Sequence, residues 1–480
     1  MLSENFAYPK LMKYFERISE IPRGSYNEAA IASYIENFAK ERGLECYKDS
    51  ANNVFVKLPA SKGCENKASI LLQGHTDMVC EKNAGVEHDF EKDPLKLYEK
   101  DGWIRAEGTT LGADNGVAVA MMLYVLDGAE GNLGDHPAIE CLFTASEEVG
   151  LDGVKSFDYS LISARQMINM DSADESMIIA GCAGGVRSSL TFEYQPVALK
   201  GEVLCISLKG LAGGHSGEDI NRGRANANKL LGRTLLTLSE SVNFNLIGFE
   251  GGTKDNAIPR EAVAFIATEQ VDETIYVIDI ISSEIKAELC GDDMGITLCA
   301  VKSTVDTNKM LDKETTDKLI FFIASVANGI FEMNKSIKEL VEFSRNLGIV
   351  KISEERSEFV LSTRSSIYSQ IDHSISQIDS YAKILGATAR HYNRYPGWKC
   401  AEKSNIREKY SDEYYNRYGS KPSVLVIHAG LECGIIKEQI PDMDIISCGP
   451  VVVDLHSPDE AMNKESFERF CGIMLGVLNS

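Results

Sequence analysis

Short apolar runs alternate with helical patterns through the first third of the chain, and this alternation restricts the fold more than any other feature. Strands are predicted at residues 68–72, 139–144 and 166–170, and a helix rich in Ala, Val, Met and Leu at residues 116–126. An earlier helix is predicted after a capping-box pattern at residues 25–28 and ends at Gly43. Such alternation predicts a sheet with helices on both faces, with ligand sites beyond the carboxyl ends of its strands.

The pattern changes after the glycine-rich residues 181–185. Strands are predicted near residues 202–208, 296–301 and 359–363, and helices near 225–238, 315–331 and 375–389, which indicates an antiparallel sheet with helices on one side. A Pro-Gly break follows at residues 395–398, and short buried strands return at 424–427 and 445–446. The last helix is predicted to begin at Ser457, which would be its N-cap. Proline would then occupy the first helical position and Glu460 the third. No internal repeat is evident.

The expected fold class is therefore α/β, a mixed sheet flanked by helices, with an α+β domain inserted into it. Residues 1–185 and 395–480 are predicted to form the first domain, and residues 186–394 the inserted one. A chain of 480 residues is too long for one ordinary core, which agrees with two domains.

Charge, cysteine usage and apolar run length exclude several classes of protein. The chain has 49 basic and 71 acidic residues and a formal charge of −22, which argues against a nucleic-acid partner. The 12 cysteines are scattered singly without a CxxC pair, as in a reducing compartment. No secretory signal pattern is visible, and the longest apolar run, residues 117–126, is far short of the roughly 20 residues that span a bilayer. We expect a cytoplasmic protein without a membrane partner.

Two adjacent carboxylates, Glu147 and Glu148, follow the predicted strand at residues 139–144. Like charges at the edge of a core need a positive partner, although a solvated acidic loop would also explain them. Four other segments carry what a pair of metal ions needs: His75 with Asp77, Asp114 between two glycines, Asp171, and His456. The set predicts a two-metal hydrolase, in which one carboxylate of the pair binds metal and its neighbour stays free as a base.

Each of these residues also has a purely structural interpretation. His75 by itself could be a turn histidine, but Asp77 two residues later could fix its imidazole. Asp114 could be a helix N-cap, Asp171 a turn residue at a strand end, and His456 a histidine packed at a domain boundary. The metal interpretation rests on the five segments together.

Five motifs in this order resemble the M20 metallopeptidase family and, within it, the group of aminoacyl-histidine dipeptidases. They are Gly-His-Thr-Asp-Met-Val at 74–79, Gly-Ala-Asp-Asn-Gly at 112–116, Thr-Ala-Ser-Glu-Glu-Val-Gly at 144–150, Asn-Met-Asp-Ser at 169–172, and Leu-His-Ser-Pro-Asp-Glu at 455–460. The resemblance covers essentially the whole chain. It implies a zinc-peptidase-like catalytic domain and an inserted lid or dimerisation domain.

The resemblance also implies the role of each residue in the predicted metal site. Asp114 would bridge two zinc ions, for which cobalt or manganese can substitute. His75 and Asp171 would complete one metal site, and Glu148 and His456 the other. Glu147 would act as general base and then as general acid, a hydroxide that bridges the metals would be the attacking group, and Asp77 would orient His75.

Residues of the inserted domain match further motifs of the family: His215 within 213–217, Asn256 within 255–259, and Arg364 within 362–365. The resemblance implies that His215 polarises the scissile carbonyl, often from a partner subunit, and that Asn256 and Arg364 hold the substrate. His428 would line the substrate pocket. Without the resemblance, each of these residues is more simply structural. The long insertion is compatible with a homodimer that exchanges its histidine or with one self-sufficient chain, and we favour the dimer.

The expected reaction is hydrolysis of unblocked dipeptides, including Xaa-His dipeptides. A tripeptidase or an N-acyl amino acid deacylase of the same family would share the metal site. A catalytically idle metal-binding or assembly protein is the alternative from another class, but such a protein has no use for Glu147 as an unligated base.

Overall fold

The computed structural model describes residues 2–305, 307–335, 337 and 340–480, and these divide into two compact units. The first unit comprises Met1–Cys182, Trp398–Val426 and Leu431–Ser480, and the second comprises Ala183–Gly397 and Ile427–Gly430. Each unit encloses an extensive apolar core of its own. The assignment of catalytic and lid or dimerisation roles to two domains stays a prediction.

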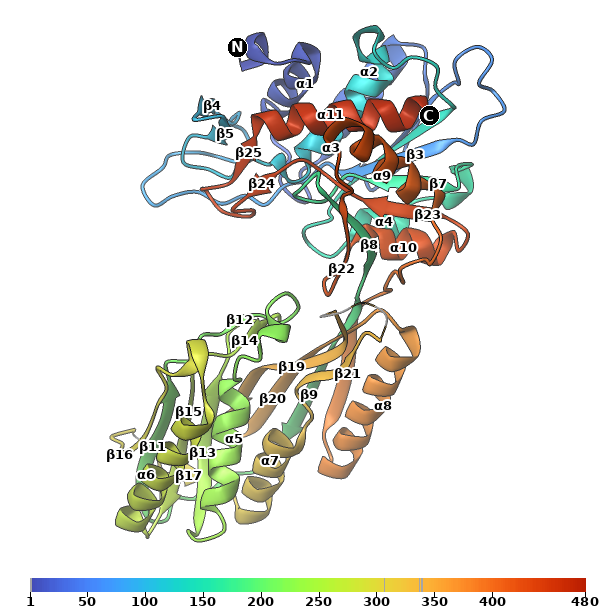
Figure 1. The fold of residues 1–480 in the computed structure, drawn as a ribbon. Coiled ribbons are helices and arrows are strands. Elements are labelled where there is room, and N and C mark those ends of the chain that lie inside the picture. Colours follow the sequence, from blue (N-terminus) through green and yellow to red (C-terminus); the bar gives the residue numbers. More distant parts are fainter. Residues whose placement is uncertain (1, 306, 336, 338–339) are drawn as a thin grey trace. The chain divides into compact units, whose positions relative to one another are not determined.

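A mixed eight-stranded sheet runs through the described residues of the first unit (Figure 1). Its order is β1 (Glu45–Lys48), β2 (Val54–Leu58), β6 (Ile139–Thr144), β3 (Ile70–His75), β7 (Gln166–Asn169), β23 (Asp444–Ser447), β8 (Met177–Cys182) and β22 (Ser423–Ile427). Strands β6, β3, β7 and β23 are parallel, so their carboxyl ends meet at one edge of the sheet. β3 and β6 are buried along their whole length, which explains their uninterrupted apolar sequences.

Helices lie on both faces of this sheet, as the sequence predicts (Figure 1). They are α1 (Pro9–Ser19), α2 (Ala29–Glu41), α3 (Ala113–Leu126), α4 (Asp152–Ser156), α9 (Asn405–Tyr418), α10 (Glu432–Gln439) and α11 (Lys464–Asn479). α3 is apolar around its whole circumference and is buried from Asn115 to Leu126, because α1 and β3 pack against it. A smaller sheet has the order β24 (Val452–Val453), β25 (Ala461–Asn463), β5 (Trp103–Ala106) and β4 (Leu97–Lys100).

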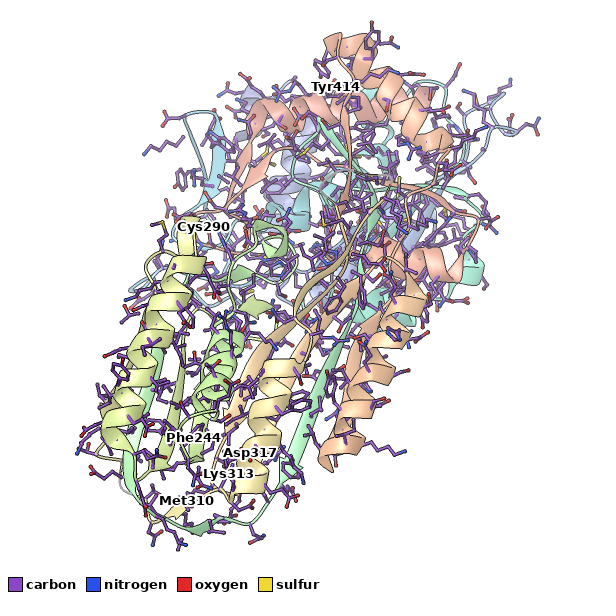
Figure 2. The ribbon with its side chains drawn as sticks, turned by 60° about the horizontal axis from the view of Figure 1, so that its bottom comes forward. Phe244, Cys290, Met310, Lys313, Asp317 and Tyr414 are labelled. Carbon is purple, nitrogen blue, oxygen red and sulfur yellow. The ribbon has the colours of Figure 1, made fainter. Side chains whose placement is uncertain are left out.

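The second unit is an antiparallel sheet with helices on one face, which confirms the predicted α+β architecture (Figure 1). The strand order is β16 (Thr297–Lys302), β11 (Glu202–Lys209), β15 (Ala262–Thr268), β13 (Phe244–Gly251), β19 (Val341–Ile352), β20 (Arg356–Ser365), β9 (Gly184–Glu193) and β21 (Thr388–Tyr395). Figure 2 shows α5 (Ala227–Leu238), α6 (Val271–Glu288), α7 (Lys313–Ser325) and α8 (Tyr368–Leu385) in front of this sheet. β11 alternates buried and half-buried residues, as expected for a strand with one covered face.

Short elements complete the described chain. The remaining strands are β10 (Val197–Ala198), β12 (Gly214–His215), β14 (Ala257–Ile258), β17 (Lys309–Met310) and β18 (Gly329–Met333). The 3-10 helices are η1 (Leu2–Asn5), η2 (Gly128–Gly131), η3 (Tyr159–Leu161), η4 (Ile220–Arg222) and η5 (Gly291–Asp293).

The predicted start of the last helix at Ser457 is wrong. α11 begins at Lys464, where the side chain of Asn463 caps it by accepting a hydrogen bond from the backbone N–H of Ser466 at 2.9 Å. The helix cannot begin earlier because β25 keeps the preceding residues extended and paired with β5. Glu460 is buried and serves another part of the chain, described below.

Two other local predictions are also corrected. The predicted helix at residues 315–331 ends at Ser325, because the residues from Gly329 onward form β18 and pair with β19. The capping box at residues 25–28 is not formed: the hydroxyl of Ser25 donates to Asp77, and Glu28 accepts from the backbone N–H groups of Tyr26 and Ser146.

Within the described residues, no helix has the length and apolar character that crossing a membrane requires. All 12 cysteines are described and none forms a disulfide; Cys80 and Cys290 are exposed, whereas six others are buried.

Candidate metal centre

The predicted metal-binding residues lie at the ends of neighbouring elements in the first unit. His75 is the last residue of β3, Glu147 and Glu148 follow β6, and Asp171 follows β7. Because these three strands are parallel neighbours, their following residues converge at one edge of the sheet. Asp114 joins them from the start of α3, and His456 from the loop between β24 and β25.

Asp114 lies between the two histidines. Its Oδ1 is 3.0 Å from Nε2 of His75, and its Oδ2 is 3.2 Å from Nε2 of His456. Nε2 of His75 is also 3.7 Å from Oδ1 of Asp171, and Nε2 of His456 is 3.2 Å from Oε1 of Glu148. The result is two triads, each with one imidazole and two carboxylates, that share Asp114.

The chemistry of these donors fits divalent metal ions. In three groups of residues, the possible ligand atoms lie within 4.8 Å of one another: His75, Asp114 and Asp171; Asp114, Glu148 and His456; and His75, Glu147 and Glu148. Imidazole nitrogen and carboxylate oxygen without thiolate suit zinc, manganese or cobalt. Four of the six side chains are carboxylates, so the cluster has a surplus of negative charge that a cation would offset.

The pKa values of the side chains in the cluster reflect this surplus of negative charge. Burial works against a charged His75, but hydrogen bonds with Asp114, Asp171 and Asp77 raise its pKa well above the ordinary value. Hydrogen bonds with Asp114 and Glu148 likewise raise the pKa of His456 to about 11. Burial opposes ionisation of Asp114 as well, yet its bonds to His456 and His75 hold its pKa below the usual range. Protons and metal ions compete for the same imidazole nitrogens.

Glu147 contributes to only one of the three groups and is not hydrogen-bonded to either histidine. Burial raises its pKa well above the ordinary value; His75 opposes this, and the charges of Asp171, Glu432 and Glu148 add to it. A raised pKa makes a carboxylate a stronger base, which favours the transfer of a proton to it.

Asp77 connects the first histidine to the acidic pair. Its Oδ1 is 3.4 Å from Nδ1 of His75 and accepts the backbone N–H of Glu147 at 3.0 Å. Its Oδ2 accepts the backbone N–H of Glu148 at 3.2 Å and the hydroxyl of Ser25 at 2.8 Å. One buried carboxylate therefore fixes the imidazole and the loop that carries both glutamates.

Two residues that the sequence analysis did not select hold the backbone of the site. Arg23 is only 1% exposed and donates hydrogen bonds to the carbonyl oxygens of Thr76 at 3.0 Å and Gly112 at 2.5 Å. Glu460 accepts the backbone N–H groups of Leu111, Gly112 and Asp114 at 2.9, 3.0 and 3.2 Å. No local sequence pattern marks Arg23 as part of the site. The sequence around Glu460 predicts the start of a helix rather than a contact with the site.

Close packing and a left-handed turn explain two glycines beside the ligands. Gly112 has a φ of +66°, which an L side chain rarely adopts, and this turn precedes Asp114. A Cβ atom on Gly74 would lie 2.4 Å from Oδ1 of Asn115, so β3 and α3 can approach only without it. Asn115 in turn donates to Oδ1 of Asp171 at 3.2 Å and orients that carboxylate.

Glu432 is the first residue of α10 and contacts the strands that precede the proposed ligands. Its Oε2 accepts hydrogen bonds from Gln73 at 2.5 Å and from Thr144 at 2.8 Å, and Oε1 of Gln73 accepts from Asn169 at 2.6 Å. Gln73 belongs to β3, Thr144 to β6 and Asn169 to β7, so Glu432 joins β3 and β6 directly and reaches β7 through Gln73. Burial raises its pKa to about 7.

The other predicted site residues, His215, Asn256, Arg364 and His428, lie together in the second unit. A Cβ atom on Gly217 would be 3.2 Å from both Nε of Arg364 and Cε1 of His215, and 2.5 Å from the carbonyl oxygen of His428. Asn256 adjoins this group, because its carbonyl oxygen accepts the backbone N–H of Ser216 at 2.8 Å.

Both histidines of this group favour the neutral form of the imidazole. Nδ1 of His215 accepts the backbone N–H of Glu218 at 3.2 Å, so in the neutral ring Nε2 carries the proton and can donate it. Burial and the charge of Arg364 lower the pKa of His215 and bring that of His428 to about 3. Arg364 is 5% exposed and donates to the hydroxyl of Tyr395 at 2.9 Å, while its Nε has no hydrogen-bond partner. The group combines neutral imidazoles with a buried cation, which suits an anionic ligand.

The fold and the candidate metal centre are typical of a metal-dependent peptidase, and comparison with known proteins agrees. Residues 71–480 match the model of peptidase family M20/M25/M40, and the chain belongs to this family of metal-dependent peptidases. The chain is 37% identical to the cytosol non-specific dipeptidase of Escherichia coli (strain K12) over 98% of its own length and 96% of that protein.

Solved structures show the same architecture. The crystal structure of aminoacylhistidine dipeptidase from Vibrio alginolyticus superimposes with a TM-score of 0.91 at 36% identity, covering 99% of this chain and 97% of that one. An aminopeptidase from Bacillus cereus matches with a TM-score of 0.58 at 16% identity over 99% of this chain and 98% of that one, which shows the fold alone.

Proposed function

We propose that this protein is a zinc-dependent dipeptidase that hydrolyses unblocked dipeptides, including Xaa-His dipeptides. The observation that carries the proposal is the pair of His-carboxylate triads that share Asp114, with Glu147 beside them as an additional carboxylate. The names of the relatives from Escherichia coli and Vibrio alginolyticus support the substrate class.

Two zinc ions, or cobalt or manganese in their place, would be held by the two triads. His75 and Asp171 would bind one ion, Glu148 and His456 the other, and Asp114 both. Bound metal would polarise the attacked carbonyl and lower the pKa of water from 15.7 to about 7. Asp77 would keep the imidazole of His75 in one tautomer and one orientation.

Glu147 is proposed as the general base and then the general acid. Its carboxylate would take the proton of the attacking water and pass it to the amine that leaves when the peptide bond breaks. The raised pKa of Glu147 supports this role, because a carboxylate with a raised pKa is a stronger base and accepts the proton of water more readily.

The group in the second unit is proposed to bind the rest of the peptide. Arg364 would pair with the free carboxylate of the substrate, and Nε2–H of His215 would donate to the scissile carbonyl oxygen. Asn256 and His428 would contact the peptide backbone. In this proposal the second unit is an inserted lid or dimerisation domain, and the enzyme is a cytoplasmic homodimer.

Replacement of Glu147 by glutamine tests the proposed base, and Glu148→Gln is the matched control. Glu147→Gln should lower kcat by at least about 1,000-fold at unchanged metal content, because it removes proton transfer but no ligand. Glu148→Gln should lower the metal content as well, since it weakens a ligand. Metal analysis by atomic emission and turnover of a free dipeptide give both quantities. Loss of both metals in Glu147→Gln would show that Glu147 is a ligand.

A substrate panel tests the reaction itself. Free dipeptides, Xaa-His included, should be cleaved faster than tripeptides or N-acyl amino acids in the presence of zinc, cobalt or manganese. Faster cleavage of blocked substrates would identify a deacylase. No hydrolysis by the metal-loaded protein would favour an idle metal-binding protein.

A further inference from the structure

Arg364 is held by one hydrogen bond and keeps one edge of its guanidinium free. Nη1 donates to the hydroxyl oxygen of Tyr395 at 2.9 Å. Nε is buried without a hydrogen-bond partner, and Nη2 has no partner among the described residues. A guanidinium binds a carboxylate best through two parallel N–H donors on one edge. Because Tyr395 occupies Nη1, the edge formed by Nε and Nη2 is the one left for a ligand.

Within the described part of the chain, no carboxylate neutralises Arg364. Its side chain is buried, and no ion pair joins it to another described residue. Arg187 on the neighbouring strand β9 is by contrast paired with Asp255 at 2.7 Å. The nearby His215 and His428 favour their neutral forms and therefore offer no countercharge. A buried charge without a partner costs free energy, so an anionic ligand at the free edge would offset that cost.

Two glycines confine the ring of Tyr395. A Cβ atom on Gly185 would lie 2.6 Å from the hydroxyl oxygen of Tyr395, and one on Gly430 would lie 2.6 Å from Cε2 of the ring. Tyr395 and Gly185 stand opposite each other where β21 pairs with β9. Neither glycine has a positive φ, so the backbone conformation does not require glycine at either position. The space that the ring needs explains both glycines, and the ring is fixed between two chain segments.

Gly217 leaves the free edge of Arg364 uncovered. A Cβ atom at this position would lie 3.2 Å from Nε of Arg364 and 2.5 Å from the carbonyl oxygen of His428. His428 is itself held in place, because its Nε2 is hydrogen-bonded to the hydroxyl of Ser344 at 2.6 Å. The φ of Gly217 is not positive either. A side chain at position 217 would therefore take up the space beside Nε that a bound carboxylate needs.

We propose that Tyr395 is a positioning residue that makes the enzyme specific for peptides with a free C-terminal carboxylate. Its hydroxyl holds Nη1 of Arg364, so that Nε and Nη2 bind the two oxygens of the carboxylate together. This inference rests on the proposed function, in which Arg364 pairs with that carboxylate, and it adds a residue to the predicted group. A phenylalanine at position 395 would keep the ring between the glycines but release Nη1. The guanidinium can then turn and offer one donor instead of two.

Tyr395→Phe tests the inference with a matched pair of substrates. A free dipeptide and the same dipeptide with a C-terminal amide differ only in the group that Arg364 would hold. In the wild type, kcat/KM should be higher for the free dipeptide. Tyr395→Phe should lower this preference about 10-fold, through a higher KM for the free dipeptide at a nearly unchanged kcat, because the contact is equally strong in the ground state and the transition state. A preference within about 2-fold of the wild-type value would overturn the inference.

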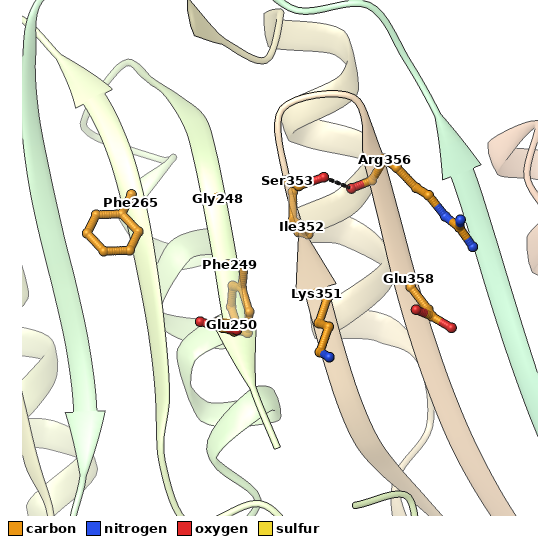
Figure 3. Close-up of a pocket in the computed structure, with 9 residues that line it drawn as sticks. All are labelled: Gly248, Phe249, Glu250, Phe265, Lys351, Ile352, Ser353, Arg356 and Glu358. Atoms are coloured by element: carbon orange, nitrogen blue, oxygen red, sulfur yellow. Dashed lines mark hydrogen bonds between the residues drawn. The ribbon is translucent and has the colours of Figure 1, made fainter. Parts of the chain in front are cut away.

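Tyr194→Phe is the matched control. Tyr194 is buried in the same unit, and its hydroxyl donates to the carbonyl oxygen of Ser353 at 2.8 Å. Figure 3 shows Ser353 in the turn between β19 and β20, beside a pocket of about 440 Å³ whose lining includes no member of the proposed substrate-binding group. This variant also loses one hydroxyl hydrogen bond, but it should keep the preference for the free dipeptide. An equal loss in both variants would mean that the unit is loosened in general, and the inference would be rejected.

Crystal structures of the wild type and Tyr395→Phe give a readout that does not depend on activity. In the variant, the guanidinium of Arg364 should leave its wild-type orientation while the Cβ atom of Arg364 stays in place. An unchanged orientation of the guanidinium would overturn the inference even if the kinetic constants differed. If the wild-type protein hydrolyses neither substrate, the proposed function is rejected. The comparison of the two structures then decides by itself whether Tyr395 positions Arg364.

Discussion

Asp77 shows how a single side chain sets the geometry of the metal centre. It contacts the imidazole of His75 and accepts the backbone N–H groups of both Glu147 and Glu148. Adjacent residues after a strand end point in different directions. Once their backbone is fixed, Glu148 is directed to His456, and Glu147 is left without that contact. The contacts of Asp77 thus explain how Glu147 and Glu148 can have the different roles proposed for them.

Glu432 makes the stability of the metal-free protein depend on pH. Its pKa is raised to about 7 in the folded chain, whereas an unfolded glutamate titrates near 4.3. Between these values the folded state binds a proton that the unfolded state has lost, so stability falls as the pH rises from about 4.3 to about 7. Glu432→Gln keeps both hydrogen bonds, because Oε2 alone accepts them, and removes the titration.

As the pH rises from 5 to 8, we therefore expect the free energy of unfolding of metal-stripped Glu432→Gln to increase relative to that of the wild type. The increase should be on the order of 3 kcal/mol. Urea unfolding of both proteins at the two pH values measures this difference. An equal change in the two proteins would show that Glu432 keeps an ordinary pKa.

At the scale of elements, the strands near the site agree with their sequence patterns, and the largest error lies in the last helix. The predicted strand at residues 139–144 coincides with β6, because a fully buried strand carries an uninterrupted apolar run. The pattern at Ser457 has the composition of a helix start, but β25 pairs with β5 and Glu460 is drawn to the turn before Asp114. Capping residues predict a helix only where no distant partner binds them first.

Lys229 stabilises the contact between α5 and α7. Its ammonium group is partly buried and donates to three carbonyl oxygens at the carboxyl end of α7, at 2.6, 2.8 and 2.6 Å. Lys229→Met should lower the free energy of unfolding of the second unit by about 1–3 kcal/mol, because buried acceptors lose their donor.

The matched control is Lys313→Met, because Lys313 lies at the amino end of α7, opposite the end that Lys229 contacts (Figure 2). Lys313 is exposed and paired with Asp317, so its loss should cost less than about 0.5 kcal/mol. Denaturant unfolding followed by far-UV circular dichroism compares the two variants. Equal effects would mean that Lys229 contributes no more than a surface lysine.

At the scale of the whole molecule, all the proposed metal ligands belong to the first unit, and so do both tryptophans, Trp103 and Trp398. Tryptophan fluorescence therefore reports unfolding of the unit that would bind metal. Metal at about 1,000 times its Kd should stabilise that unit by about 4 kcal/mol, since ligand binding stabilises the folded state. Chelation should lower the midpoint of the fluorescence transition in the wild type.

Glu148→Gln is the control for this effect, and it should show a smaller shift on chelation because one of the two proposed metal sites has lost a ligand. A fluorescence transition that chelation leaves unchanged in the wild type would contradict metal binding by the first unit.

Two helices of the second unit, α6 and α8, bury residues at corresponding positions, a likeness that the sequence does not reveal. The matched positions of α6 and α8 share burial more than identity: Val271 corresponds to Ile371, Ser282 to Ala382 and Ile285 to Leu385. A core constrains size and polarity rather than residue type, so two helices can bury the same positions while their sequences differ.

The sequence by itself determined where the strands beside the proposed metal centre end and which side chains follow them. Motifs and apolar runs are local, and a residue after a buried parallel strand must emerge at a known edge of the sheet. Tertiary structure alone decided that Arg23 and Glu460 hold the turn before Asp114, and that Asp77 connects His75 to the loop that carries Glu147 and Glu148. These features depend on contacts between residues far apart in the chain, and single-sequence periodicity contains no information about such partners.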